Sequence, residues 1–178
     1  ITGANGQLGR CLQETLDAQG IDFVALSRAD LDITNSALVK ESFNSIKPDV
    51  VINTAAYTNV EQAEIDSVAA FKINQLGAAN VATASKSIGA KLVHFSTDYV
   101  FAGNGNSPWQ VNDLTEPISI YGKSKLAGEV EILKEYPEKS LIIRTAWLYS
   151  PYGKNFYKTI LTKALNGDES VRVVNDQQ

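Results

Sequence analysis

The sequence ITGANGQLGR, residues 1–10, decides the fold, because glycines at positions 3, 6 and 9 precede a helical pattern. Glycine lets the chain turn sharply, and it lets backbone N–H groups at the positive end of a helix dipole approach a phosphate. A tight turn without a ligand would use the same residues. The position of Gly3, Gly6 and Gly9 at the first β–α junction favours a dinucleotide-binding turn.

Apolar runs and helical patterns alternate along the rest of the chain. The predicted strands, after a remnant at Ile1, are residues 22–26, 49–56, 91–96, 140–147 and a last run from 171. The predicted helices are residues 8–16, 34–46, 67–88, 126–133 and 156–161. Strands that are apolar on both faces and separated by helices lie parallel. The pattern therefore predicts an α/β fold, a Rossmann-like doubly wound parallel sheet with helices on both faces.

Length and composition limit the possible functions. A chain of 178 residues with 44% hydrophobic residues fits one domain, which we expect to span residues 1–178 and to be incomplete at both ends. The net charge is −4 without a polybasic run, so we expect no nucleic-acid partner. No apolar run is long enough to span a membrane, and the single cysteine, Cys11, suits a reducing compartment. We expect a cytoplasmic protein that does not bind membranes.

The end of the second predicted strand bears on the choice of cofactor. Ser27 and Arg28 stand where an acidic residue would normally accept the ribose hydroxyls of NAD. A hydroxyl and a guanidinium would instead receive a 2′-phosphate, so the sequence favours NADPH. The competing interpretation is that Arg28 is a solvated charge. Asp32 and Ile33 follow as an acidic–apolar pair, which is either an adenine contact or a surface turn.

The second motif is YGKSK, residues 121–125, at the start of a predicted helix. Tyr121 and Lys125 share a helix face, and the strand ending at Thr97 brings a hydroxyl to the carboxyl edge of the sheet. A nearby ammonium lowers the pKa of a phenol from about 10, which would make Tyr121 usable as an acid–base group. The competing interpretation pairs Lys125 with Glu129, one helical turn further on.

Six sequence blocks, taken together and in order, resemble the dTDP-4-dehydrorhamnose reductases of the extended short-chain dehydrogenase/reductase family. They are GANGQLG, INTAAYTNVEQAE, STDYVFAG, YGKSKLAGE, IIRTAWLY and VVNDQQ. The resemblance implies catalysis by Thr97, Tyr121 and Lys125. The expected cofactor contacts are Gly3, Gly6, Gln7, Leu8, Gly9, Arg28, Asp32, Ile33, Ala55, Ala56, Tyr57, Tyr121 and Lys125. The expected substrate contacts are Thr58, Val60, Thr97, Asp98, Tyr99, Tyr121 and Trp147.

The resemblance also implies an activity, which is reduction of the C4 ketone of dTDP-4-dehydro-L-rhamnose by NADPH, or by NADH, in nucleotide-sugar and polysaccharide biosynthesis. Tyr121 would protonate the developing alkoxide, Thr97 would hydrogen-bond the same oxygen, and Lys125 would bind the nicotinamide ribose. In this family the subdomain that grips the nucleotide comes mostly from the carboxyl-terminal part, which we expect to be largely absent from residues 1–178. A homodimer is a further option.

Two alternatives remain open. A nucleotide-sugar dehydratase or epimerase of the same extended family would share the glycine turn and the Tyr/Lys pair. Such dehydratases typically follow the strand-end threonine with Asp-Glu, whereas Asp98 is followed here by Tyr99. A non-catalytic NADP-binding subunit, similar to the regulatory β subunit of methionine adenosyltransferase, would also keep much of this pattern. A turnover measurement separates an enzyme from such a binding protein.

Two further side chains invite a functional interpretation. His94 lies in an apolar run without a cluster at metal-ligand spacing, so we interpret it as a buried or edge residue with satisfied hydrogen bonds. We therefore predict no metal site. Trp109 lies in the loop 102–117, which is long enough to be functional. It would either cover the sugar or anchor the loop.

Overall fold

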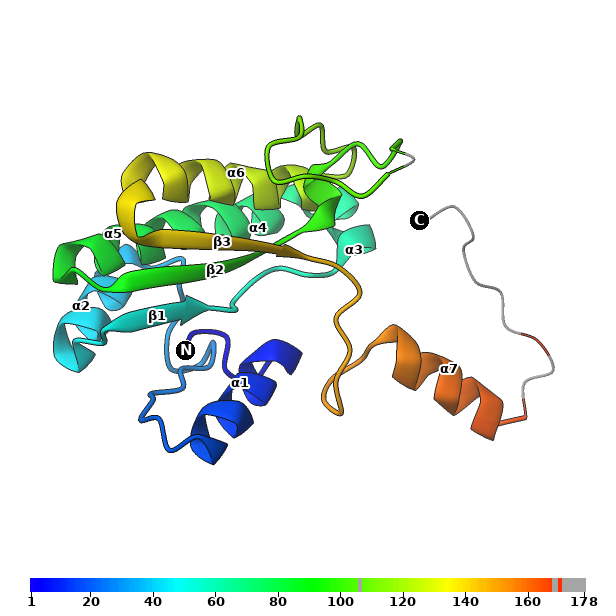
Figure 1. The fold of residues 1–178 in the computed structure, drawn as a ribbon, viewed down its shortest axis with the longest axis horizontal. Helices are drawn as coiled ribbons and strands as arrows, with labels where there is room; N and C mark the ends of the chain where they lie inside the picture. Colours follow the sequence, from blue (N-terminus) through cyan, green and yellow to red (C-terminus); the bar gives the residue numbers. More distant parts are fainter. Residues whose placement is uncertain (106, 168–169, 171–178) are drawn as a thin grey trace.

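The computed structural model describes residues 1–105, 107–167 and 170 (Figure 1). Within these residues the sheet has the order β1 (Val50–Asn53), β2 (Lys91–Thr97) and β3 (Ser140–Thr145). Both strand pairs are parallel. The carboxyl ends of the three strands therefore meet at one edge of the sheet.

The segment 1–4 continues this sheet beyond β1. Thr2 forms parallel bridges with Asn53 on one side and Leu26 on the other, and its N–H donates to the Ile52 carbonyl at 3.0 Å. The chain thus places one neighbour on each side of residues 1–4. The strand order therefore reverses at residues 1–4, and the point of reversal is the switch point of a Rossmann-like sheet. The predicted fold class is confirmed.

Figure 1 shows the helices, the last of which lies away from the sheet beyond the end of β3. They are α1 (Gln7–Ala18), α2 (Ser36–Ile46), α3 (Val60–Ile65), α4 (Ser67–Phe71), α5 (Ala78–Ile88), α6 (Ile120–Glu135) and α7 (Phe156–Leu165). A π-helical segment, Lys72–Gly77, joins α4 to α5, and short 3₁₀ turns cover Asp98–Val100 and Pro137–Lys139. In Figure 1, α5 and α6 run along the strands, whereas α1 lies apart from them near the amino terminus.

The helix ends follow ordinary capping chemistry. The Asn35 side chain accepts a hydrogen bond from the Leu38 N–H at the start of α2, as asparagine does at helix N-termini. Gly89 follows α5 with φ of +73°, a left-handed conformation that costs glycine little. The helices predicted at 34–46 and 67–88 are thus confirmed, the second with a π-helical interruption.

The core lies between the sheet and the helices α2, α5 and α6. It includes Val39 and Phe43 from α2, Val81 from α5, Leu92 from β2 and Ile132 from α6. Val39 and Phe43 stand four residues apart, the spacing that puts two apolar side chains on one helix face. Full burial of a side chain of this kind stabilises a fold by about 1.5–3 kcal/mol. These contacts hold α5 and α6 against the strands that carry the site.

The strand predicted at 22–26 is wrong as a regular element. Leu26 makes the one bridge of this segment, and Val24 is 46% exposed. The hydrogen-bonded neighbour of this segment is the short run 1–4.

Two predicted apolar faces do not lie where the sequence suggests. The run at 140–147 contains an edge strand of the described sheet, and Leu141 is 56% exposed. On α6, Val130 and Leu133 face outward. The buried residues of α6 are Gly122, Ser124, Lys125, Gly128, Glu129 and Ile132. Apart from Ile132, the buried face of α6 is therefore built from small and polar residues.

Gly128 explains this buried face. A Cβ atom at this position would lie 2.2 Å from the Asn74 carbonyl oxygen, so α6 packs directly on the backbone of the π-helical segment.

The remaining predicted helices lie within α1, α6 and α7, and the strands predicted at 49–56 and 91–96 contain β1 and most of β2. The last predicted strand, from 171, lies outside the described residues. In the described part of the chain, no helix has the length and apolar character needed to cross a membrane.

Candidate active site

The glycine turn between residues 1–4 and α1 depends on close backbone contacts. Gly3 has φ of +71°, and a Cβ atom there would lie 2.6 Å from the Ala55 nitrogen. A Cβ atom at Gly9 would lie 2.6 Å from the Gly3 carbonyl oxygen. The N-cap of α1 is Gly6, which offers no side-chain hydrogen bond to the first turn. The first N–H groups of α1 are thus left for a ligand or solvent, as an anion site requires.

A cleft of about 740 Å³ opens at the switch point of the sheet. The expected residues that line it are Gly3, Gly6, Gln7, Leu8, Gly9, Arg28, Asp32, Ile33, Ala55, Ala56, Thr58, Val60, Thr97, Asp98, Tyr99, Tyr121, Lys125 and Trp147. Tyr57 alone among the expected residues is not in its lining. Ser96, which the sequence places beside Thr97 at the carboxyl edge of the sheet, also lines the cleft. The lining further includes residues that the sequence did not suggest, namely Asn5, Leu31, Thr54, Ile73, Phe95, Thr145, Ala146, Leu148, Gly153 and Lys154. Half of these adjoin an expected residue in the sequence, which is the one signal that could have found them.

Arg28 and Asp32 both line the cleft and carry opposite charges. Asp32 accepts a hydrogen bond from the Thr34 N–H at 2.9 Å, and this bond, with Arg28 nearby, lowers the pKa of Asp32. The Ser27 hydroxyl donates to the Asp30 carboxylate at 2.6 Å, so it is already engaged. The carboxylate of Asp30 therefore lies close to the end of the second predicted strand, three residues after Ser27.

The start of α6 places Tyr121 in the lining of the same cleft. The Ser119 side chain caps the helix by accepting from the Gly122 N–H at 3.0 Å. A Cβ atom at Gly122 would lie 2.2 Å from the Tyr99 carbonyl oxygen, so this glycine lets α6 approach the turn after β2. The rings of Tyr99 and Tyr121 meet edge to face, with centroids 5.7 Å apart. Tyr121 and Thr97 thus come together at the carboxyl edge of the sheet.

The hydroxyl groups near Tyr121 have defined partners. Thr97 Oγ1 donates to the Asp98 carboxylate at 3.0 Å and accepts from the Tyr99 N–H at 3.2 Å. Burial raises the pKa of Tyr121 above 10.0; the Thr97 hydroxyl opposes this rise, and the charge of Asp98 adds to it. The sequence predicted a lowered tyrosine pKa, and this direction is wrong for the structure, because loss of water outweighs the other contributions.

Lys125 points into the protein. Its side chain is 2% exposed, and its Nζ atom lies 2.6 Å from the Phe95 carbonyl oxygen and 3.3 Å from His94 Nε2. Burial lowers the pKa of Lys125 to about 8, against the opposing charge of Glu129. The amine of Lys125 therefore loses its proton more readily than the amine of a solvent-exposed lysine, which spacing in the sequence did not indicate.

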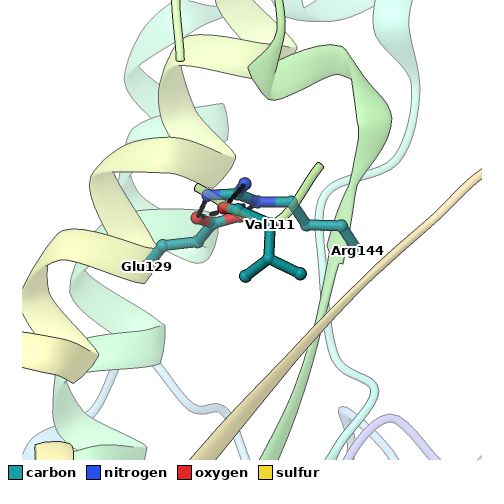
Figure 2. A network of polar contacts seen from close by, with 3 residues as sticks. All are labelled: Val111, Glu129 and Arg144. Atoms are coloured by element: carbon teal, nitrogen blue, oxygen red, sulfur yellow. Dashed lines mark hydrogen bonds and ion pairs between the residues drawn. The ribbon is translucent and has the colours of Figure 1, made fainter. Parts of the chain in front are cut away.

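Glu129 makes its ion pair with β3. Arg144 Nη2 lies 2.6 Å from Glu129 Oε2, and Arg144 Nε donates to the same carboxylate at 3.0 Å. Figure 2 shows this pair, with the Val111 carbonyl oxygen 3.4 Å from Arg144 Nη1. The competing interpretation, in which Lys125 pairs with Glu129, is therefore wrong for this structure.

Asn74 explains the position of Tyr57. Its side-chain oxygen accepts from the Tyr57 N–H at 2.8 Å, and its nitrogen donates to the Tyr57 carbonyl and to the Ser124 hydroxyl at 3.0 and 2.9 Å. The buried amide thus holds the segment 55–58 against α6. Tyr57 is attached through its backbone, so it supports the lining residues on either side of it. No local sequence signal identifies Asn74, because its partners lie 17 and 50 residues away.

The segment 147–155 lies against the glycine end of the cleft. Trp147 adopts φ of +52°, which is unusual for a non-glycine residue, and its ring meets Phe156 edge to face. Gln7 Oε1 accepts hydrogen bonds from Ser150 Oγ and Asn155 Nδ2 at 3.2 and 2.9 Å. The side chain of Gln7 therefore fixes this segment to α1, which places Trp147 in the cleft lining.

Trp109 is stacked on Phe101, with ring centroids 4.7 Å apart, and is not in the cleft lining. The structure thus favours the anchoring interpretation of this loop tryptophan. Among the described residues, no group of three or more His, Cys, Asp or Glu side chains is arranged to hold a metal ion.

The parallel sheet has a glycine turn at its switch point, and a tyrosine and a lysine line the same cleft. This arrangement is typical of proteins with a Rossmann-like dinucleotide-binding fold. The family model described as "RmlD substrate binding domain" matches residues 1–178, and the chain belongs to this family. The predicted resemblance to dTDP-4-dehydrorhamnose reductases is therefore confirmed.

Individual relatives agree with this assignment. The chain is 43% identical to the "Spore coat polysaccharide biosynthesis protein SpsK" of Bacillus subtilis, over 99% of this chain and 62% of that protein. It is 44% identical to the dTDP-4-dehydrorhamnose reductase of Aggregatibacter actinomycetemcomitans, over 99% of this chain and 60% of that protein. A crystal structure of dTDP-4-dehydrorhamnose reductase from Bacillus anthracis, in complex with NADP, superposes with a TM-score of 0.90 at 46% identity, covering 93% of this chain and 59% of that one. The chain thus spans about 60% of the length of the curated relatives that it matches.

Proposed function

We propose that the chain carries the cofactor-binding and catalytic part of an oxidoreductase that reduces the C4 ketone of dTDP-4-dehydro-L-rhamnose, giving dTDP-L-rhamnose. The observation that carries this proposal is that the glycine turn and the side chains of Thr97, Tyr121 and Lys125 line the same cleft. Relatives at 42–44% identity are named for this reaction. A role in nucleotide-sugar and polysaccharide biosynthesis follows from the same proposal.

A dinucleotide fits the residues present. Gly3 and Gly9 let the turn pack closely against neighbouring backbone, and Gly6 at the N-cap leaves the first N–H groups of α1 without a side-chain partner. The helix dipole favours a diphosphate there. The B. anthracis relative was solved in complex with NADP, which supports NADPH as the cofactor here. Arg28 would attract a 2′-phosphate, whereas Asp30 and Asp32 nearby would favour ribose hydroxyls, so NADH is a second candidate. When bound, the cofactor would supply the hydride.

The chain's own residues would handle the proton. Tyr121 would donate its phenol proton to the oxygen of the substrate carbonyl as negative charge develops there. The raised pKa of Tyr121 suits this role, because it keeps the phenol protonated at neutral pH. Thr97 would hydrogen-bond the same oxygen after its hydroxyl turns away from Asp98. Lys125 would turn from the Phe95 carbonyl toward the cleft to meet the ribose hydroxyls.

The substrate side of the cleft would be formed by Thr58, Val60, Asp98, Tyr99 and Trp147, which all line it. A small-molecule nucleotide sugar is the expected partner, the cytoplasm is the expected location, and a homodimer is one option for the assembly. The dehydratase alternative is less well supported, because the residue after Asp98 is Tyr99 and no second carboxylate follows it directly. An epimerase of the same family and a non-catalytic NADP-binding subunit are the remaining candidates.

Turnover tests this proposal. The natural full-length protein is mixed with NADPH and dTDP-4-dehydro-L-rhamnose, and cofactor oxidation is followed by absorbance. We expect turnover, and we expect Tyr121→Phe to lower it by about 10²–10⁴ while leaving cofactor affinity unchanged. Tyr157→Phe on α7 is the matched control, because this tyrosine is 62% exposed and outside the cleft. NADPH binding without any turnover would favour the binding-protein alternative, and full turnover in Tyr121→Phe would refute the assigned proton donor.

A further inference from the structure

His94 is buried with satisfied hydrogen bonds, as the sequence predicted, and these bonds form an ordered chain that ends on Lys125. The side chain is 1% exposed on β2. Its Nδ1 atom lies 2.9 Å from Asn53 Nδ2, and its Nε2 atom lies 3.3 Å from Lys125 Nζ. The imidazole therefore connects β1, at the switch point, with the helix that carries Tyr121.

The orientation of the Asn53 amide is fixed by its other partners. Asn53 Oδ1 accepts from the Thr2 hydroxyl at 2.6 Å and from the Ala55 N–H at 3.2 Å. A backbone N–H can only donate, so the amide oxygen must face Ala55 and the amide nitrogen must face His94. The amide nitrogen carries only donor hydrogens. His94 Nδ1 must therefore be the acceptor in this contact.

This contact determines where the imidazole holds its proton. A neutral imidazole has one N–H, so an unprotonated Nδ1 puts the hydrogen on Nε2. The Nε2–H then points at Lys125 Nζ. An ammonium has three donor hydrogens and no acceptor, whereas a neutral amine has a lone pair that can accept from Nε2–H. The Phe95 carbonyl accepts from either form of Lys125, so the histidine contact is the one that distinguishes them.

Burial shifts both groups of this pair toward their neutral forms. Burial and the neighbouring Lys125 hold the pKa of His94 well below its usual value. Glu129 favours the charged form of Lys125, but its carboxylate is already paired with Arg144 at 2.6 Å. Burial opposes Glu129 and dominates, which leaves the pKa of Lys125 at about 8.

We propose that His94 is a positioning residue for Lys125: Asn53 holds it as the Nε2–H tautomer, which donates to Nζ and favours the neutral amine in the inward position. The charged form is favoured once Nζ leaves His94, and the cleft is open to it because Lys125 also lines that cleft. Protonation of the lysine is thereby coupled to its movement toward the ligand. Only the catalytic consequence of this coupling rests on the proposed function.

The tautomer of His94 can be measured directly by ¹⁵N NMR of protein labelled with ¹⁵N-histidine. The chain contains one histidine, and loss of its signals in His94→Gln assigns them. We expect Nδ1 to show the chemical shift of an unprotonated nitrogen and Nε2 that of a protonated one, from neutral to mildly alkaline pH. The opposite tautomer, or a charged imidazole in this range, would overturn the proposal. This experiment requires no variant that alters the core.

The coupling to Lys125 is tested by Asn53→Asp. An aspartate accepts at both oxygens, so His94 would carry its proton on Nδ1 and present a lone pair to Nζ. We expect the pKa of Lys125, followed by its ¹³Cε shift and assigned with Lys125→Met, to rise from about 8 toward 10.5. The rise should be about one unit or more, the scale on which a single charged neighbour shifts a pKa.

His94→Gln is the matched variant for this measurement. A glutamine amide can accept from Asn53 and donate to Nζ, so we expect it to keep the low pKa of Lys125. An Asn53→Asp protein in which the tautomer switches and the lysine pKa does not move would overturn the proposal. Both measurements are made without substrate or turnover, so failure of the proposed reduction would leave their outcome unchanged.

Discussion

Arg144 Nη2 lies 2.6 Å from Glu129 Oε2, so the buried carboxylate of α6 is paired with β3 and not with Lys125 one helical turn earlier. This pair fixes α6 against the edge strand of the described sheet. It also keeps Lys125 free of a direct ion pair among the described residues, so that its hydrogen bonds go to His94 and Phe95. Arg144 therefore holds α6, the helix that carries Tyr121, while Lys125 remains available to the cleft.

We predict that Glu129→Gln lowers the free energy of unfolding by about 1.5–3 kcal/mol, because it leaves the Arg144 guanidinium without its counter-charge in a largely buried site. Urea unfolding of the two proteins measures this difference. Glu135→Gln is the matched control, since the Lys86–Glu135 pair spans 3.4 Å with side chains 49% and 40% exposed. An exposed pair contributes about 0.2–1 kcal/mol at most. Equal losses in the two variants would show that burial of the Glu129 pair has no effect.

We predict that Gly9→Ala destabilises the protein more than Gly6→Ala and abolishes dinucleotide binding. A Cβ atom at Gly9 would lie 2.6 Å from the Gly3 carbonyl oxygen and 2.9 Å from the Ala4 Cα atom, whereas a Cβ atom at Gly6 would lie 3.2 Å from that same oxygen. Overpacking of this kind costs about 1–3 kcal/mol. Thermal unfolding and NADPH fluorescence titration measure the two effects. A Gly9→Ala protein that binds NADPH normally would contradict the assigned phosphate turn.

We predict that the free energy of unfolding depends on pH through the buried His94. Its folded-state pKa lies well below the ordinary 6.5. Between these two pKa values His94 is protonated in the unfolded chain and neutral in the folded protein. This contribution to stability is present above pH 6.5 and is lost as the pH falls toward the folded-state pKa. The free energy of unfolding should decrease by up to about 1.4 kcal/mol per pH unit over this interval.

Urea unfolding between pH 6.5 and about 5, above the range in which most carboxylates titrate, measures this slope. His94→Gln removes the titrating group, so its unfolding free energy should change less over the same interval. An equal slope in both proteins would show that His94 is accessible to protons in the folded state.

The pKa of Tyr121 should move in opposite directions in two variants. Asp98→Asn removes a negative charge that raises this pKa, and Thr97→Val removes a hydroxyl that lowers it. We therefore expect the tyrosine to ionise at lower pH in Asp98→Asn and at higher pH in Thr97→Val. NMR of ¹³C-labelled tyrosine measures both, with the signal of Tyr121 among seven tyrosines assigned by Tyr121→Phe. Shifts of the same sign in both variants would contradict the geometry around the phenol.

Short-range patterns predicted the parts of the site that are built from neighbouring residues. Gly3 and Gly9 are six residues apart, and Tyr121 and Lys125 are one helical turn apart, so spacing alone places each pair. The carboxyl edge of a parallel sheet then brings Thr97 to the same cleft. Capping residues predicted the start of α2 and the end of α5 in the same way, because a cap acts within a few residues.

Long-range contacts could not be predicted in this way. The partner of the Lys125 amine is His94, 31 residues earlier, and Gln7 meets Ser150 across 143 residues. The direction of the Tyr121 pKa shift depends on burial, which spacing does not report. The outward position of Val130 likewise follows from the contact of Gly128 with Asn74, which decides the buried face of α6.

We expect Tyr121 to face the reactive end of a dinucleotide whose diphosphate binds at residues 3–9. A crystal structure of the natural full-length protein with bound NADP⁺ would show both positions. We predict the diphosphate at the start of α1 and the nicotinamide ring beside the Tyr121 hydroxyl, with Lys125 turned from the Phe95 carbonyl toward the ribose. A dinucleotide bound elsewhere, or a Tyr121 hydroxyl on the side away from the nicotinamide, would contradict it.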